Sequence, residues 1–98
     1  MRRAAKVDAN HQAIVAALRT SGCVVQSLAA VGRGCPDLLV GLAGQTYLME
    51  VKSGASKHDD AAQSKWHAEW NGARVWLVRS PAAALWAVGL LHSAEMPE

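Results

Sequence analysis

Two apolar runs around a glycine-containing turn dominate the middle of the chain, within the stretch PDLLVGLAGQTYLMEVK that spans residues 36 to 52. Such runs predict a β-hairpin that pairs residues 37–42 with residues 45–52. The hairpin carries Asp37, Glu50 and Lys52 among its leucines and valines. Strands of this kind belong in a sheet interior, so the three charges need a physical explanation.

The remaining elements follow from periodicity and from residues that begin or end helices. The predicted elements are a helix over 9–20 capped by Asp8, a strand within 23–29, a helix from Asp59 or Asp60 to Trp70, a strand over 74–78, and a helix that begins at Ser80-Pro81. The resulting order is αβββαβα. It predicts an α/β fold in which helices flank a small mixed β-sheet.

The chain length of 98 residues predicts one domain over residues 1–98, with a short basic segment at 1–7 that we expect to be flexible. No apolar run approaches the roughly 20 residues of a membrane span, and no apolar segment follows the basic start. We therefore expect a soluble, intracellular protein. The two cysteines, Cys23 and Cys35, show no metal-binding spacing, and we expect free thiols.

The net charge of +2, from 10 Lys and Arg against 8 Asp and Glu, does not by itself indicate a nucleic-acid partner. The balance changes if Asp37 and Glu50 bind a cation, because the remaining acidic side chains are then outnumbered further. That balance favours a polyanionic partner without identifying one.

The turn length decides whether the hairpin charges converge. Glu50 and Lys52 share one face because strand side chains alternate. A two-residue turn at Ala43-Gly44 places Asp37 opposite Glu50, whereas a slip of one residue moves Glu50 to the other face. The simplest turn therefore predicts two carboxylates side by side.

Two facing carboxylates repel each other and destabilise a sheet unless something compensates. Lys52 can offset one charge, and Mg²⁺ can bridge both, with the backbone carbonyl of Val51 as a third protein ligand. The alternative is an ordinary salt bridge between Glu50 and Lys52 on a solvated edge strand. The pairing with Asp37 favours the metal site.

Pro36-Asp37 followed by Glu50-Val51-Lys52 resembles the signature of the PD-(D/E)xK nuclease superfamily. The segments DANHQAIVAALRTSGCVVQSLAAVGRGCPDLLVG, YLMEVKSG and AAQSKWHAEWNG are similar to the small stand-alone virus-type replication-repair nucleases, the VRR-NUC family of phages and prophages. The resemblance extends from about residue 8 to residue 91. It implies a restriction-endonuclease-like core.

The resemblance also implies roles for particular side chains. Asp37 and Glu50 match the metal-binding acidic pair, Lys52 matches the lysine that positions or activates the attacking water, and Gln63 matches a glutamine that supports the site. The implied cofactor is Mg²⁺, with Mn²⁺ as a substitute. Related nucleases often carry a glutamate in the first helix, and here Asn10, His11 or a water would take its place.

The function implied is that of a metal-dependent endodeoxyribonuclease selective for DNA structure, such as Holliday junctions or flaps. The implied setting is a homodimer encoded by a phage or prophage and located in the bacterial cytoplasm. Arg33, Lys57 and Lys65 are the candidate DNA contacts. The alternative is a non-catalytic nucleic-acid-binding module, which the missing glutamate favours.

The aromatic residues are open to two interpretations. Trp66 and Trp70 are four apart on the predicted second helix, a spacing that suits base stacking but is more typical of a core. We expect both to lie in the core, together with Trp76 and Trp86. We expect His67 at the surface.

Overall fold

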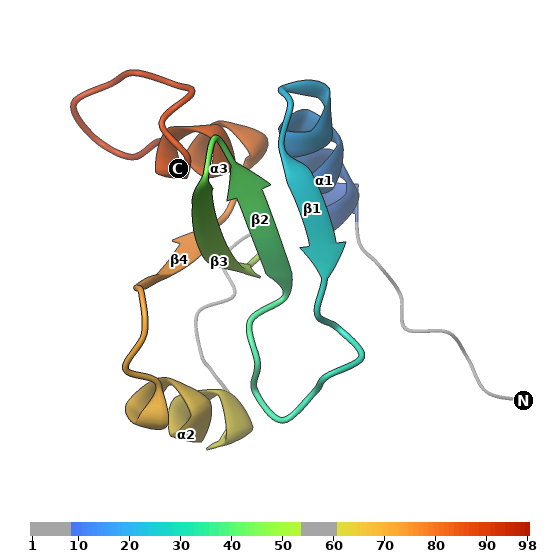
Figure 1. Ribbon diagram of the computed structural model, residues 1–98, viewed down its shortest axis with the longest axis vertical. Helices are drawn as coiled ribbons and strands as arrows, with labels where there is room; N and C mark the ends of the chain where they lie inside the picture. Colours follow the sequence, from blue (N-terminus) through green and yellow to red (C-terminus); the bar gives the residue numbers. More distant parts are fainter. Residues whose placement is uncertain (1–8, 54–60) are drawn as a thin grey trace, which may run out of the picture.

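The computed structural model describes residues 9–53 and 61–98. Its elements, in chain order, are α1 (Ala9–Thr20), β1 (Val24–Ser27), β2 (Leu38–Leu42), β3 (Gln45–Val51), α2 (Ala61–Glu69), β4 (Val75–Val78) and α3 (Pro81–Ala87) (Figure 1). The predicted order αβββαβα is confirmed. The proposed caps Asp8, Asp59 and Asp60, and the segment 1–7, lie outside the described residues.

The four strands form one mixed sheet in the order β1-β2-β3-β4. β2 pairs antiparallel with both β1 and β3, and β4 runs parallel to β3. Both α1 and α3 lie against the same face of this sheet (Figure 1). Because β3 and β4 are parallel, the chain must cross over between them. This connection contains α2.

A single buried cluster holds α1 and α3 on the sheet. Its members are Ile14, Leu18, Cys23, Val25, Leu38, Val40, Met49, Val78, Ala83, Ala84, Ala87 and Val88. Small alanines on α3 let that helix approach α1 closely. The helix begins as the sequence predicts, with the Ser80 hydroxyl accepting a hydrogen bond from the Ala83 amide at 3.0 Å.

The hairpin turn sets the register of β2 and β3. Ala43 and Gly44 have φ of 51° and 82°, so both lie in the left-handed region that a two-residue type I′ turn requires. Leu42 therefore pairs with Gln45, and Leu38 pairs with Met49. The predicted register is confirmed, and its continuation places Asp37 opposite Glu50.

The two faces of the sheet have different environments. Leu38 and Met49 point toward α1 and α3 and are fully buried. Their neighbours Asp37 and Glu50 point to the opposite face, which neither helix covers. On that face Leu77, the partner of Glu50 in β4, is 43% exposed. The sheet therefore separates the apolar core from the charged residues of the hairpin.

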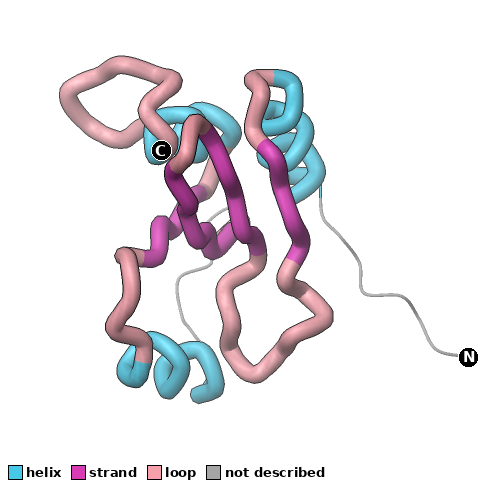
Figure 2. The backbone as a smooth tube through the Cα atoms, viewed as in Figure 1, coloured by secondary structure: helices cyan, strands magenta, loops and turns pink. Residues whose placement is uncertain are grey.

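The second helix stands away from the sheet (Figure 2). All nine residues of α2 are described, and none of them is buried. The expectation that Trp66 and Trp70 lie in the core is therefore wrong. The Trp66 side chain is half-buried and Trp70 is 43% exposed, because α2 packs no apolar face on the sheet and the two rings stack on each other instead.

Trp76 and Trp86 lie at the margin of the core rather than inside it. Both are half-buried, and their rings meet edge to face with centroids 6.1 Å apart. The Trp86 indole nitrogen donates a hydrogen bond to the Ser93 carbonyl oxygen at 3.0 Å. A partly buried indole N–H needs such a partner, and Ser93 provides it for Trp86.

Of the three helices in the described ranges, none combines the length and the apolar character that crossing a bilayer requires.

Candidate active site

Asp37 is held in place through both its backbone and its carboxylate. The Asp37 carbonyl oxygen accepts a hydrogen bond from the Leu28 amide at 2.8 Å, which extends the β1–β2 pairing beyond the strand end. Its side-chain Oδ2 accepts a hydrogen bond from the Val51 amide at 2.8 Å. These two bonds direct the carboxylate across the hairpin toward the end of β3.

Glu50 is a buried carboxylate that is only half satisfied. The residue is 4% exposed, and its Oε2 accepts a hydrogen bond from the Gln63 side-chain nitrogen at 2.6 Å. Its Oε1 is buried and has no hydrogen-bond partner among the described residues. An ionised carboxylate with an unpaired buried oxygen is costly unless a cation or a proton compensates for it.

Lys52 lies beside this carboxylate and is also buried, with 8% of the residue exposed. Its Nζ donates to the Gln63 side-chain oxygen at 3.4 Å and lies 3.9 Å from Glu50 Oε2. The alternative of an ordinary salt bridge on a solvated face is therefore wrong, because both partners are enclosed. A buried acid–lysine pair contributes little stability on balance, so stability alone does not account for this pair.

Gln63 brings α2 into the site. Its side-chain amide donates to Glu50 and accepts from Lys52, so one residue orients both. The contact depends on the loop before Asp37. Gly34 has φ of 82°, and a Cβ at this position would lie 2.1 Å from the Ala62 carbonyl oxygen. Only glycine permits this backbone contact, which sets the start of α2 beside the site.

The surroundings of Glu50 strongly favour its protonated form. Burial is the largest cause, followed by repulsion from the Asp37 carboxylate, and together they raise the pKa of Glu50 to about 7. The charge of Lys52 and the hydrogen bond from Gln63 act in the opposite direction. A divalent cation between the two carboxylates would remove the repulsion and give Oε1 a partner.

Cys35 lies close to the same two carboxylates. Burial, and then the charges of Asp37 and Glu50, raise the pKa of its thiol above the usual value. A thiol held in its protonated form is a poor nucleophile. The expectation that Cys23 and Cys35 are free thiols is confirmed, with Cys23 buried and Cys35 half-buried.

The donor set suits a hard cation that retains waters. Within residues 9–53 and 61–98 there is no cluster of three or more His, Cys, Asp and Glu side chains. Two carboxylates and a backbone oxygen, completed by water, are the ligands that Mg²⁺ typically takes. The residues present therefore fit Mg²⁺, and the Val51 carbonyl stays a predicted third ligand.

The first helix contributes an amide to the periphery of the site. The Asn10 side-chain nitrogen donates to the carbonyl oxygens of Lys52 and Arg79, each at 3.0 Å. Asn10 therefore ties α1 to the chain just beyond β3 and β4. The replacement of the glutamate that related nucleases often carry, by Asn10, His11 or a water, stays a prediction.

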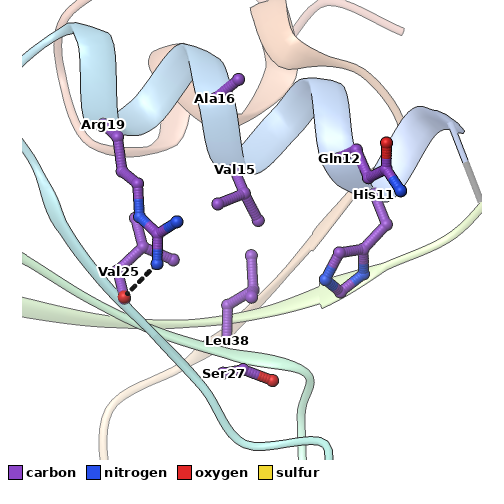
Figure 3. Close-up of a pocket in the computed structure, with 8 residues that line it drawn as sticks. All are labelled: His11, Gln12, Val15, Ala16, Arg19, Val25, Ser27 and Leu38. Atoms are coloured by element: carbon purple, nitrogen blue, oxygen red, sulfur yellow. Dashed lines mark hydrogen bonds between the residues drawn. The ribbon is translucent and has the colours of Figure 1, made fainter. Parts of the chain in front are cut away.

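His11 lines a separate hollow of about 430 Å³ between α1 and the sheet. Its imidazole points from α1 toward the strands, and Arg19 closes the other end by donating to the Val25 carbonyl oxygen at 3.1 Å (Figure 3). The described residues that line this hollow do not include Asp37 or Glu50. It is distinct from the candidate active site.

Two of the predicted DNA contacts come together on the other side of the site. A hollow of about 490 Å³ beside α2 is lined by Arg33, Ala62, Lys65, Trp66 and Glu69. Lys57, the third predicted contact, lies outside the described residues. The sequence AAQSKWHAE of α2 shows no one-sided apolar pattern. The absence of this pattern is the sequence signal against a core position for Trp66.

The sequence matches no protein-family model, no curated protein is significantly similar to it, and no solved structure matches its fold significantly.

Proposed function

We propose that this chain is a metal-dependent endodeoxyribonuclease that hydrolyses phosphodiester bonds. The observation that carries the proposal is the buried Glu50 Oε1, which has no hydrogen-bond partner among the described residues and belongs to a carboxylate beside Asp37 and Lys52. An apolar core gains nothing from such a group. A cation-binding site explains it, and the order of Pro36-Asp37 and Glu50-Val51-Lys52 is that of the PD-(D/E)xK nucleases.

The cofactor best suited to these donors is Mg²⁺, with Mn²⁺ as a substitute. When bound, the ion would polarise the phosphate oxygens, lower the pKa of a coordinated water and stabilise the leaving oxygen. Asp37 and Glu50 would hold it. Lys52 would place a positive charge where negative charge develops on the phosphate, and Gln63 would keep Lys52 and Glu50 in position.

The substrate proposed is DNA with a branched or otherwise irregular structure, such as a Holliday junction or a flap, bound by a homodimer. The small size of the domain supports this proposal, because two copies would be needed to grip a large substrate. The likeness of the sequence to the VRR-NUC family of phages and prophages supports it too. The bacterial cytoplasm is the setting that this likeness implies.

The second candidate is a non-catalytic module that binds nucleic acid and retains the nuclease fold. One observation favours it. The amide of Asn10 donates to two backbone carbonyl oxygens, so α1 brings structural support to the site and no carboxylate. A site with only two acidic ligands would bind its cation weakly.

Cleavage of a labelled four-way junction and of a matched linear duplex, in Mg²⁺, Mn²⁺ or EDTA, separates the two candidates. We expect cutting that requires the metal, prefers the junction and is lost in Lys52→Ala. Arg74→Ala is the matched control, because it removes a positive charge that lies 3.7 Å from the Trp76 ring centre, away from the site. Tight binding without cutting in either metal would reject the nuclease and support the binding module.

A further inference from the structure

Trp66 in α2 and Trp70, which directly follows the helix, form a stack that the active site does not use. The Trp66 and Trp70 rings are nearly parallel, at 18°, with centroids 4.9 Å apart. The Trp70 indole nitrogen donates to the Ala73 carbonyl oxygen at 2.7 Å, and a Cβ at Gly72 would come within 2.4 Å of the ring. Trp70 is therefore fixed by the turn after α2 and in turn supports Trp66.

Trp66, and not Trp70, lines the hollow of about 490 Å³. That volume lies within the range of small-ligand sites. A half-buried indole backed by a second stacked ring presents a flat π surface of the kind on which nucleic-acid bases stack. Helix α2 buries no residue, so these rings are not explained by packing.

Positive charge flanks the same surface. Arg33 and Lys65 line the hollow together with Trp66, and both are exposed. One carboxylate, Glu69, lies 3.2 Å from Lys65 and offsets part of this charge. The remaining balance still favours an anion. Arg33 has φ of 59° and lies between Gly32 and Gly34, which are also in the left-handed region. This backbone conformation is strained for an arginine, and such strain is typical of functional loops.

Helix α2 and the loop before Asp37 link the hollow to the candidate active site. Gln63, which contacts Glu50 and Lys52, lies one turn before Trp66 on the same helix, and Gly34 holds the Arg33 loop against Ala62. The hollow is therefore placed to contact a DNA strand that is bound at the carboxylates.

We propose that this hollow binds one unpaired nucleotide, with its base stacked on Trp66 and its phosphate paired with Arg33 and Lys65. The proposal refines the substrate class of the proposed nuclease and rests on that function for its biological meaning. It specifies DNA with a single-stranded portion next to the cleavage position. A base inside a duplex has no free face to offer the indole.

The test is a binding measurement in EDTA, where no metal-dependent cutting occurs. Fluorescence anisotropy would compare a labelled blunt duplex with the same duplex carrying an unpaired single-stranded extension. We expect the wild-type chain to prefer the extended duplex, and Trp66→Ala to weaken that binding about tenfold while leaving blunt-duplex binding unchanged. Trp66→Phe should retain most of the affinity because it keeps a π face.

Ser64→Ala, an exposed change on the same helix, is the matched control and should alter neither affinity. Equal affinity of the wild type for both duplexes would overturn the proposal, even if the chain cuts DNA in Mg²⁺. Equal losses on both duplexes, with a dimer-to-monomer shift in sedimentation for Trp66→Ala, would also overturn it and assign the stack to an interface between copies. A Trp66-dependent preference in a chain that never cuts DNA would uphold the nucleotide site and reject only the nuclease.

Discussion

The side-chain nitrogen of Gln63 donates to Oε2 of Glu50 over 2.6 Å, although thirteen residues separate the two in the chain. The oxygen of the same amide accepts a hydrogen bond from Lys52. A helix that buries none of its own residues is thereby joined to Glu50 and Lys52, the buried charged residues in the described part of the chain. The orientation of Glu50 and Lys52 therefore depends on a residue outside the sheet.

Gln63→Ala should lower Mg²⁺-dependent cleavage by about 10- to 100-fold, because residues that orient metal ligands typically have effects of this size. The thermal midpoint should fall as well, because the buried Oε2 of Glu50 would lose its hydrogen bond from Gln63, so the rates are compared at a temperature where both proteins remain folded. Initial rates over a Mg²⁺ titration, with circular dichroism melting of the same samples, would measure both. Ser64→Ala serves as the control, and unchanged rates in Gln63→Ala would refute the positioning role.

The stability of the metal-free protein should fall as pH rises. The pKa of Glu50 is about 7 in the folded chain, against a usual value of 4.5. The folded state therefore keeps a proton that the unfolded state releases within this interval. The contribution of Glu50 to stability is fully present below pH 4.5, decreases until about pH 7 and amounts to about 3 kcal/mol.

Urea unfolding in EDTA, at several pH values across this interval, would measure the slope. Glu50→Gln should remove most of it, because an amide of similar size carries no charge at any of these pH values. Added Mg²⁺ should restore stability to the wild type above pH 7 and not to the variant, since an ion that binds only the folded state stabilises it. An identical slope in both proteins would contradict the assignment to Glu50.

Asn10→Ala should cost about 2 kcal/mol of unfolding free energy, because two half-buried hydrogen bonds to the carbonyl oxygens of Lys52 and Arg79 would be lost. Denaturant unfolding would measure the cost. Thr20→Ala, at the exposed end of the same helix, should change stability by less than about half a kcal/mol. Equal effects of the two substitutions would mean that Asn10 does not tie α1 to the sheet.

Ala43→Asn should stabilise the protein by about 0.5–1 kcal/mol. Ala43 has φ of 51°, which costs an alanine more than an asparagine, and Asn-Gly is a preferred pair for this turn. Thermal unfolding would measure the gain. Ala29→Asn, at an exposed position outside the left-handed region, should bring no such gain. A lower midpoint for Ala43→Asn would contradict the turn assignment.

Much of the fold follows from local signals. The helix over 9–20 was predicted with its observed bounds because its apolar spacing is regular and Ser21-Gly22 ends it, with Gly22 at φ of 100°. The hairpin register followed from the Ala43-Gly44 turn alone. The end of α3 at Ala87 has a weaker signal, because the apolar residues Val88, Leu90 and Leu91 continue the sequence past it and the left-handed Gly89 marks the stop.

The sequence by itself determined the order of elements and the pairing of Asp37 with Glu50, because alternation in strands and a two-residue turn leave one register. The tertiary structure alone decided that Glu50 and Lys52 are buried and that Gln63 joins them. It also decided that Trp66 lines a hollow and not the core. These outcomes depend on where α2 lies, and a helix without an apolar face carries no sequence signal for its packing partner.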